Sequence, residues 1–243
     1  MAAEPALSVV VPCYNEAGRV GPTVARILAW MRAQPTPMEL LVVADGCSDG
    51  TAATARAAAA GDPRLTVIEE PHNHGKGWAV RRGMAAARGQ ELLFSDADLS
   101  TPIEEVDKLR AALAAGHQVA IASRGLRSSQ VTQHQPWWRE RMGRTFNWFV
   151  QALALPGIHD SQCGFKLFTR AAADVVFPRQ TLPGFGFDVE ILWIARKHGF
   201  RIAEVPVVWV NNPLSKVHPV RDATRMLLDL LRVRRNDRRG CYR

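Results

Sequence analysis

The stretch Leu92-Leu93-Phe94-Ser95-Asp96-Ala97-Asp98-Leu99-Ser100-Thr101-Pro102 decides how the rest of the chain is interpreted. An apolar run ends there at two carboxylates spaced one residue apart. Because side chains alternate between faces along an extended segment, we expect Asp96 and Asp98 to point the same way. Paired hard oxygen ligands suit Mg²⁺ or Mn²⁺, which share their coordination shell with phosphates. An Asp-x-Asp pattern is short, so a solvated loop remains the alternative interpretation.

The residues that follow the aspartates predict the start of a helix. Thr101 is placed as the N-cap, Pro102 at the first helical position and Glu104 three residues after the cap, which is the pattern of a capping box. A strand therefore ends at the aspartates and a helix leaves directly after them. In open α/β sheets, this carboxyl end of a strand is where ligands bind.

Strand-like and helix-like segments alternate on both sides of this stretch. The expected strands are 7–11, 40–43, 65–68, 91–95 and 119–122, and segments of helical spacing follow at 20–31, from 51 through the alanine run, 77–88 and 106–113. This alternation predicts right-handed crossovers and an α/β fold. Its sheet is doubly wound and mostly parallel, with helices on both faces.

The second half of the sequence is less regular. It predicts helices over 138–155 and 188–198, and strands over 164–169 and 201–210, with Pro206 demoting the last to an edge or bulge position. An amphipathic helix is expected over 220–233, with Met226, Leu227, Leu230 and Leu231 on one side. No repeat or linker divides the chain. We therefore expect a single domain over 1–219, with halves 7–123 and 124–219, followed by a basic amphipathic C-terminal tail over 220–243.

Composition limits the possible classes of protein. The 243 residues are 47% hydrophobic, which is enough for one large α/β domain, and no run of about 18 apolar residues predicts a membrane span. The N-terminus has no basic region followed by an apolar core, so no secretory signal is expected. The four cysteines are scattered and predict reduced thiols without a metal site. A net charge of +8 favours anionic partners, namely nucleotides, phospholipid surfaces or nucleic acid.

Three further polar loops follow predicted strands. They are Pro12-Cys13-Tyr14-Asn15-Glu16, Asp45-Gly46-Cys47-Ser48-Asp49-Gly50-Thr51 and Asn73-His74-Gly75-Lys76-Gly77. Glycines let backbone amides approach a ligand, Asp49 can cap the next helix, and Lys76 at a helix start suits a phosphate or sugar oxygen. Each loop alone is ordinary turn chemistry. Together with the aspartate pair they are expected to converge on one edge of the sheet.

These loops resemble the inverting glycosyltransferases of family 2, which have a GT-A fold. The strings Asp160-Ser161-Gln162-Cys163-Gly164-Phe165-Lys166-Leu167-Phe168, Gly184-Phe185-Gly186-Phe187-Asp188-Val189-Glu190 and Glu204-Val205-Pro206-Val207-Val208-Trp209 narrow the resemblance to dolichyl-phosphate β-glucosyltransferases and other polyprenyl-phosphate hexosyltransferases. The resemblance covers nearly the whole chain. It implies transfer of a hexose, glucose foremost, from a nucleoside-diphosphate sugar to a polyprenyl phosphate. The first half then becomes the nucleotide-sugar half and the second the acceptor half.

The resemblance also implies roles for residues of the first half. Asp96 and Asp98 would hold Mg²⁺ or Mn²⁺ on the diphosphate. Asp98 would also be a catalytic residue, because it binds that metal. The nucleotide-sugar contacts implied are Pro12, Tyr14, Glu16, Asp45, Lys76, Asp96 and Ala97. The family usually has two aspartates before the glycine of the second loop, and here Ala44 replaces the first. The nucleotide base, uracil or guanine, therefore stays open.

The acceptor side needs cations beside a lipid phosphate. Arg124 stands where related mannosyl enzymes bind phosphate, and the further candidates are Arg139, Arg141, Arg144 and Lys216, with Lys166 a weaker one. Arginines on a helix with Trp137 and Trp138 are equally compatible with a solvated face over core aromatics. Asp188, the second catalytic candidate, would orient the acceptor or take a proton. A simple helix N-cap is the alternative role for Asp188.

Charge in the tail predicts where the protein acts. Residues 221–243 hold eight arginines against three aspartates, so we expect peripheral attachment to an anionic membrane surface at the cytoplasmic inner face, with a solvated tail as the alternative. Three rival functions compete with this interpretation. A family 2 enzyme with a soluble acceptor remains open. A nucleotidyltransferase would carry a glycine-rich loop with an arginine after the first strand, and this sequence has Pro12-Cys13-Tyr14-Asn15-Glu16 there instead. A nucleic-acid-binding module conflicts with the paired carboxylates, so no nucleic-acid partner is expected.

Overall fold

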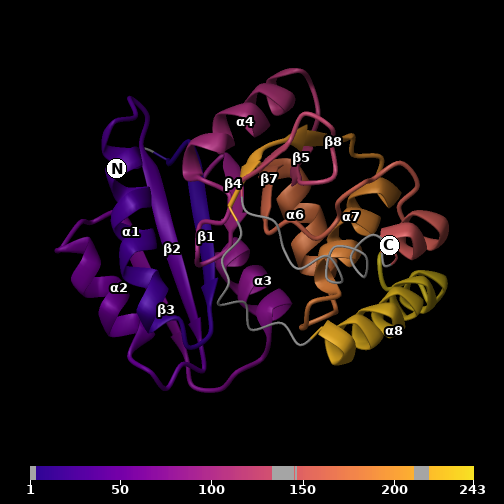
Figure 1. Cartoon of the computed structure of the whole chain (residues 1–243), viewed down its shortest axis with the longest axis horizontal. Helices are drawn as coiled ribbons and strands as arrows, with labels where there is room; N and C mark the ends of the chain where they lie inside the picture. Colours follow the sequence, from indigo (N-terminus) through magenta and orange to yellow (C-terminus); the bar gives the residue numbers. More distant parts are fainter. Residues whose placement is uncertain (1–3, 133–144, 146, 211–218) are drawn as a thin grey trace.

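The computed structural model describes residues 4–132, 145, 147–210 and 219–243. The first half (Figure 1) contains β1 (Leu7–Cys13), α1 (Ala17–Arg32), β2 (Met38–Asp45), α2 (Thr51–Ala59), β3 (Leu65–Glu70), α3 (Lys76–Ala86), β4 (Glu91–Ser95), the 3₁₀ turn η1 (Ile103–Glu105), α4 (Val106–Ala114) and β5 (Val119–Ser123). The second half contains β6 (Gln130–Val131), β7 (Phe165–Thr169), α6 (Arg170–Arg179), α7 (Phe187–Lys197), β8 (Ile202–Pro206), β9 (Val208–Trp209) and α8 (Pro219–Arg238). Residues 147–153 are also helical.

One seven-stranded sheet crosses both halves of the chain, in the order β3-β2-β1-β4-β7-β5-β8. Six strands are parallel and β7 runs antiparallel between β4 and β5. The order of the parallel strands reverses between β1 and β4, which is the topological switch point where open α/β sheets bind ligands. The predicted mostly parallel, doubly wound sheet is confirmed.

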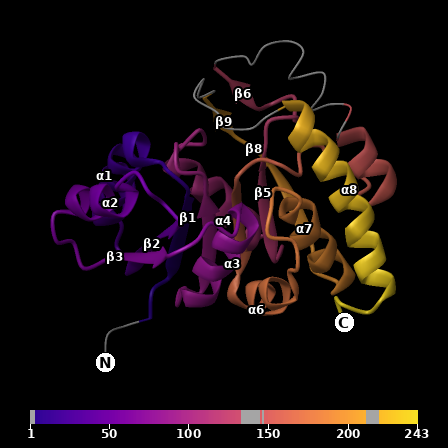
Figure 2. The same cartoon turned by 90° about the horizontal axis from the view of Figure 1, so that it is seen from below.

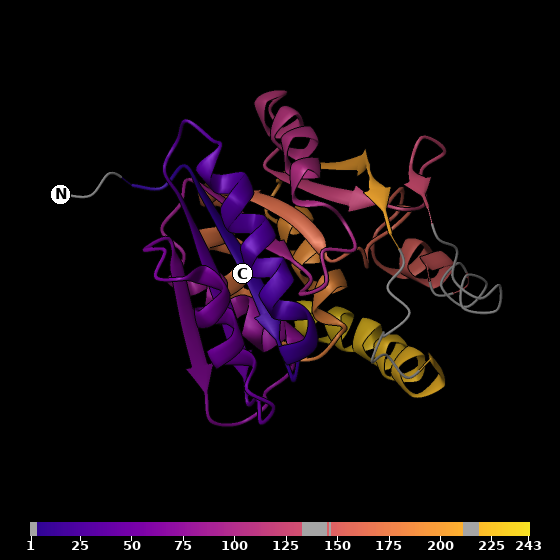
Figure 3. The same cartoon turned by 60° about the vertical axis from the view of Figure 1, so that its left-hand side comes forward.

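Strand alternation explains why helices cover both faces of the sheet. Val9 and Val11 lie in one apolar core with α1, α2 and α4, whereas Val10 lies in the other with α3, α6 and α7. The same division separates Leu93 from its neighbours in β4. Figure 3 shows α1 crossing one face of the sheet, and Figure 2 shows α3, α6 and α7 together on the other.

Proline residues sit where the strands can accommodate them. Pro12 was expected to end β1, yet the strand continues to Cys13 and Pro12 pairs with Val43 of β2. Pairing with β4 stops at Val10, so the missing N–H of Pro12 faces no partner strand. β8 lies at the edge of the sheet, as Pro206 predicted. The strand predicted over 201–210 is nevertheless divided at Pro206, and Val208–Trp209 pairs with β6 in a separate two-stranded sheet.

One prediction about helices is wrong, and one helix was not predicted. Thr101 does not cap a helix: Pro102 has an extended ψ of 143°, a 3₁₀ turn follows, and α4 starts only at Val106. Thr101 is instead buried, with its hydroxyl 3.7 Å from Cys163 Sγ. The prediction also lacked α6, which begins where the hydroxyl of Thr169 accepts a hydrogen bond from the Ala172 amide.

The C-terminal helix α8 packs against the body instead of forming a free tail. Leu230 and Val233 are buried in the core beside α7, and Met226 and Leu227 pack partly against it. Leu231, predicted for the same side, is 53% exposed together with Leu228. The buried face is therefore displaced from the predicted one. Among the described residues, no helix combines the length and apolar character required to cross a bilayer.

Tyr242 anchors the end of α8 in the core. Its ring is fully buried and its hydroxyl donates to Glu190 Oε1 at 2.6 Å. Burial and the adjacent Glu190 carboxylate raise the pKa of Tyr242. Glu190, itself fully buried on α7, also accepts hydrogen bonds from the Thr181 and Leu182 amides, so one carboxylate ties the α6–α7 loop to the C-terminus.

Tyr242→Phe is expected to lower the free energy of unfolding by roughly 1–3 kcal/mol, because a buried carboxylate loses one of its donors. Urea denaturation followed by circular dichroism measures this change. A loss below about 0.5 kcal/mol, typical of surface substitutions, would show that water replaces the hydroxyl.

Candidate active site

The predicted donor-side residues gather at the carboxyl edge of the sheet. Tyr14 follows β1, Asp45 ends β2, Lys76 begins α3 and Asp96 directly follows β4. Contacts join the separate loops: Lys76 Nζ lies 2.6 Å from Asp96 Oδ1. Arg19 of α1 lies between Glu16, at 2.6 Å, and Asp98, at 3.8 Å. The predicted convergence on one edge is therefore present among these side chains.

The aspartate pair lies in a turn, not in an extended segment as predicted. β4 ends at Ser95, the Leu99 amide donates to the Asp96 carbonyl, and Leu99 has a φ of +47°. Asp98 Oδ1 accepts the Ser100 amide at 3.0 Å. Between the two acids, the Ala97 carbonyl accepts the Thr23 hydroxyl of α1 at 2.7 Å. The turn is thus fixed by its own backbone and by α1, and both carboxylates remain partly exposed.

Gly164, at the start of β7, makes room for the Asp96 carboxylate. Its carbonyl accepts the Asp96 amide at 3.0 Å, and a Cβ at Gly164 would lie 2.1 Å from Asp96 Oδ2. The Asp-Ser-Gln-Cys-Gly string therefore places its glycine where the first aspartate needs space. Two partly exposed carboxylates, one held in this cradle, fit a divalent metal that also binds a diphosphate.

Gly164→Ala is expected to reduce kcat/KM at least tenfold, because the new methyl group displaces the Asp96 carboxylate. The metal concentration giving half-maximal rate should rise in parallel. Gly18→Ala is the matched control, since a Cβ there meets nothing within 4 Å. Equal rates for the two variants would contradict a role for this cradle.

Asp45 holds the third loop in place. Its buried carboxylate accepts the backbone amides of His74 and Gly75 at 2.9 and 2.8 Å and lies 3.0 Å from His74 Nδ1. The His74 ring stacks on Trp78 of α3, with centroids 4.1 Å apart. Both Asp45 oxygens are thus used to shape the loop that carries Lys76. Any nucleotide contact of Asp45 would add to this positioning role.

The first and second loops are tied together around Tyr14. The Glu16 amide donates to the Thr51 hydroxyl at 2.8 Å, and Asn15 Oδ1 accepts the Ser48 amide at 2.9 Å. Asp49 accepts amides from both Thr51 and Ala17, so it serves the starts of two helices rather than one. Pro12 is buried, whereas the Tyr14 side chain is 47% exposed at this junction.

Asp188 is paired with a buried lysine and is not a helix cap. It is the second residue of α7, only 4% exposed, and its Oδ1 bonds Lys166 Nζ. Burial raises the pKa of Asp188, although Lys166 and Lys76 oppose the shift. Lys166 is fully buried on β7, donates to the Cys163 carbonyl at 2.6 Å and lies over the Phe94 ring. Lys166 stays a weaker candidate phosphate ligand, and its ammonium is already bonded to Asp188 and to the Cys163 carbonyl.

Arg124 lies directly after β5, where it was predicted, and is held by Asp160. Its guanidinium makes a bidentate pair with the Asp160 carboxylate at 2.7 and 3.0 Å and lies over the Trp209 ring. Asp160 and its hydrogen bonds raise the pKa of Arg124 in spite of its burial, so the cation is permanent. The prediction missed Asp160, although it opens the Asp-Ser-Gln-Cys-Gly string. Arg139, Arg141, Arg144 and Lys216 lie outside the described residues.

The cysteines have no catalytic environment. All four are free thiols, and burial raises the pKa of Cys163 to about 11. A thiol of this kind stays protonated and is a poor nucleophile at neutral pH. The prediction of reduced cysteines is consistent with this geometry.

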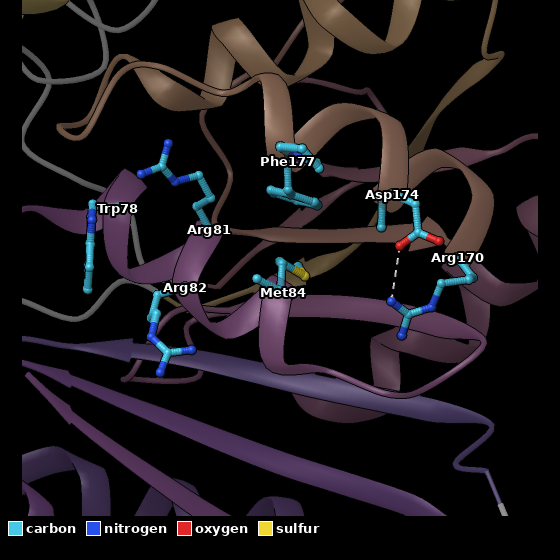
Figure 4. A pocket seen from close by; sticks show the side chains of 10 residues that line it. Trp78, Arg81, Arg82, Met84, Arg170, Asp174 and Phe177 are labelled. Carbon is cyan, nitrogen blue, oxygen red and sulfur yellow. Dashed lines mark hydrogen bonds and ion pairs between the residues drawn. The ribbon is translucent and has the colours of Figure 1, made fainter.

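A cavity of about 390 Å³ between α3 and α6 lies apart from these residues (Figure 4). Met84 and Phe177 are among the residues that line it, and the arginines that line it already have protein partners. Arg82 bonds Glu70, and Arg170 bonds Asp174 and the carbonyl of Gly89. The cavity contains none of the predicted site residues.

Comparison with known proteins agrees with this geometry. Residues 8–177 match the family described as glycosyl transferase family 2. The chain is 36% identical over 250 residues to the dolichyl-phosphate beta-glucosyltransferase of Homo sapiens, covering 98% of this chain and 77% of that protein. It is 35% identical over 240 residues to the Drosophila melanogaster protein of the same name, covering 93% and 74%.

A solved structure shares the fold. Glucosyl-3-phosphoglycerate synthase from Mycobacterium tuberculosis, in complex with Mn²⁺, uridine diphosphate and glucosyl-3-phosphoglycerate, has a TM-score of 0.70. The alignment covers 94% of this chain and 80% of that one at 20% identity, so it shows the GT-A fold alone. Taken with the match over residues 8–177 and the two relatives above 30% identity, this shows that the chain belongs to glycosyl transferase family 2.

Proposed function

We propose that this protein transfers glucose from a nucleoside-diphosphate sugar to a polyprenyl phosphate of the dolichyl type, with inversion at the anomeric carbon. The observation that carries the proposal is the 36% identity, over 98% of the chain, to a protein named for that reaction. The site geometry supports it, because an acidic pair, Lys76 and the guanidinium of Arg124 lie at the same edge of the sheet. Ala44 leaves the nucleotide base open.

On the donor side, Asp96 and Asp98 would hold Mg²⁺ or Mn²⁺ against the diphosphate. Such a metal supplies Lewis-acid neutralisation of the charge that develops on the departing diphosphate. Lys76, at the N-terminus of α3, adds an ammonium and the helix end to the same anion. Tyr14, Glu16, Pro12 and the Ala97 backbone would line the nucleoside between the first two loops.

On the acceptor side, the lipid phosphate is already anionic at neutral pH, since its second pKa is about 6. The protein therefore needs to orient it more than to deprotonate it. Arg124, locked by Asp160, offers a positioned guanidinium. Asp188 lies near Lys76 and would orient the acceptor from the opposite side, or take a residual proton. Arg139, Arg141, Arg144 and Lys216 remain candidate phosphate ligands.

An activity screen tests this proposal. UDP-glucose and GDP-mannose are each incubated with Mn²⁺, the protein and a short polyprenyl phosphate, and the lipid product is identified by mass spectrometry. We expect glucosyl transfer from UDP-glucose to the lipid. A parallel reaction offers a water-soluble phosphate as acceptor. Transfer to the soluble phosphate alone would refute the lipid acceptor, and no transfer from either sugar would refute the donor assignment.

The exposed face of α8 supports membrane attachment at the cytoplasmic inner surface. At helical spacing, the exposed Leu228 and Leu231 share this face with the exposed Arg225, Arg232 and Arg235. Trp148, in the helical segment 147–153, is also exposed. Apolar side chains flanked by arginines suit the boundary of an anionic bilayer.

Replacing Arg225, Arg232 and Arg235 together by glutamine is expected to weaken binding to phosphatidylserine vesicles about a hundredfold, since each basic residue contributes roughly 1 kcal/mol near an anionic surface. Cosedimentation measures the bound fraction. The control removes the same charge elsewhere, at Arg26, Arg32 and Arg56 of α1 and α2. Equal loss in both variants would indicate that net charge, not the α8 face, drives binding.

A further inference from the structure

Lys76 occupies the position of a cation on the first aspartate. Its ammonium lies 2.6 Å from Asp96 Oδ1, with side chains 23% and 38% exposed, respectively. The lysine therefore already places a cationic side chain on one of the two carboxylates of the proposed metal site.

The backbone around Lys76 is fixed on both sides. Gly75 has a φ of +110°, and a Cβ there would lie 2.6 Å from the Pro183 carbonyl. The Trp78 amide donates to that carbonyl at 3.1 Å. Asp45 holds the other end of the loop through the His74 and Gly75 amides. The backbone is thus held on both sides, so a change of partner at Lys76 requires movement of its side chain only.

A divalent cation on Asp96 would meet this ammonium at close range. The two like charges compete for one carboxylate, and Asp188 is already bonded to Lys166. A diphosphate brings new negative charge, which can accept the ammonium released from Asp96. Metal and diphosphate then favour each other's binding, because the diphosphate draws the Lys76 ammonium away from Asp96 and leaves that carboxylate to the metal.

We propose that the Lys76 ammonium occupies Asp96 while the divalent metal is absent and moves to the diphosphate when the metal and nucleotide bind. Binding of the metal and binding of the nucleoside diphosphate then strengthen each other. This inference rests on the proposed function, since it takes Asp96 as a metal ligand. It goes further by assigning the coupling between the two ligands to one side chain.

Binding experiments without turnover test this assignment. Free Mn²⁺ is measured by electron paramagnetic resonance during titration of the protein, alone and with saturating UDP or GDP. For the wild-type protein we expect the nucleotide to tighten Mn²⁺ binding at least tenfold, within the usual range of coupling between two sites. In Lys76→Gln, Mn²⁺ alone should bind about tenfold tighter, and the effect of nucleotide on Mn²⁺ affinity should fall about tenfold, to what direct contact between metal and diphosphate contributes.

Two further variants separate the lysine's charge from other effects. Lys76→Arg keeps a cation and should keep the coupling. Arg82→Gln removes an exposed cation from the same helix, where it pairs with Glu70, and should leave Mn²⁺ binding unchanged. Wild-type protein that binds Mn²⁺ equally well with and without nucleotide would overturn the inference, even if Lys76→Gln failed to fold. Undiminished coupling in folded Lys76→Gln would also overturn it.

The outcomes distinguish this inference from the proposed function. Wild-type protein that binds neither Mn²⁺ nor nucleotide would refute the donor site itself. Equally strong coupling in wild-type and Lys76→Gln protein would refute only the role of Lys76 and leave the transferase proposal standing.

Discussion

Asp98→Asn is expected to reduce kcat by two to three orders of magnitude while leaving the fold intact. Asparagine keeps the oxygen that accepts the Ser100 amide, so the turn after β4 survives. The substitution removes the negative charge and a hard ligand for the metal, a loss comparable to removing a principal transition-state contact. Initial rates with UDP-glucose and a polyprenyl phosphate, over a range of Mn²⁺ concentrations, measure the effect.

Asp107→Asn provides the matched control for this experiment. Asp107 is an exposed aspartate in the first turn of α4, and its substitution makes the same change of charge and shape. We expect rates within twofold of the wild-type protein. Full activity in Asp98→Asn would show that Asp98 does not hold the metal, and the donor assignment would then have to move to other residues.

Lys166→Met is expected to lower the free energy of unfolding by about 3–5 kcal/mol at pH 7. The variant leaves the Asp188 carboxylate buried without its bonded cation, and breaking a buried pair on one side has a cost of this size. Guanidinium denaturation measures it. Lys108→Met, which breaks an exposed pair with Glu105, should change stability by less than about 1 kcal/mol.

The pH dependence of the stability loss and a double variant both test whether the loss in Lys166→Met comes from the Lys166–Asp188 ion pair. Burial raises the pKa of Asp188 in the folded state, and loss of Lys166 raises it further. A raised folded-state pKa means that protonation favours folding, so the defect of Lys166→Met should shrink as the pH falls from 7 toward 4. The double variant Lys166→Met/Asp188→Leu should recover most of the lost stability. A defect that is independent of pH would point to packing instead of charge.

The strands and loops were predictable because their signals are local. The runs ending at Cys13, Asp45 and Ser95 are short, apolar and followed by polar loops, so their place at one edge followed from parallel topology. Pro206 marked an edge strand by its missing amide. The capping pattern at Thr101 was misleading because burial beside Cys163 outweighs a local preference for capping.

The contacts that hold the site together were not predictable from local patterns. Arg124 pairs with Asp160 and Lys166 with Asp188 across 36 and 22 residues of sequence, and no periodicity relates such partners. The approach of Gly164 to Asp96 depends on β7 entering the sheet antiparallel beside β4. Only the specific string around residues 160–168 hinted at these contacts. It identified the residues without saying what they touch.

The antiparallel strand β7 has a consequence for how the chain acquires its structure. During synthesis β4 and β5 emerge well before β7, yet they are not neighbours, because β7 separates them. The edge of β4 therefore stays open until residues 165–169 arrive to cover it. Gly164, which makes room for the Asp96 carboxylate, arrives together with β7, so a ribosome-bound fragment that lacks β7 has both an incomplete donor pocket and an unprotected strand edge prone to aggregation.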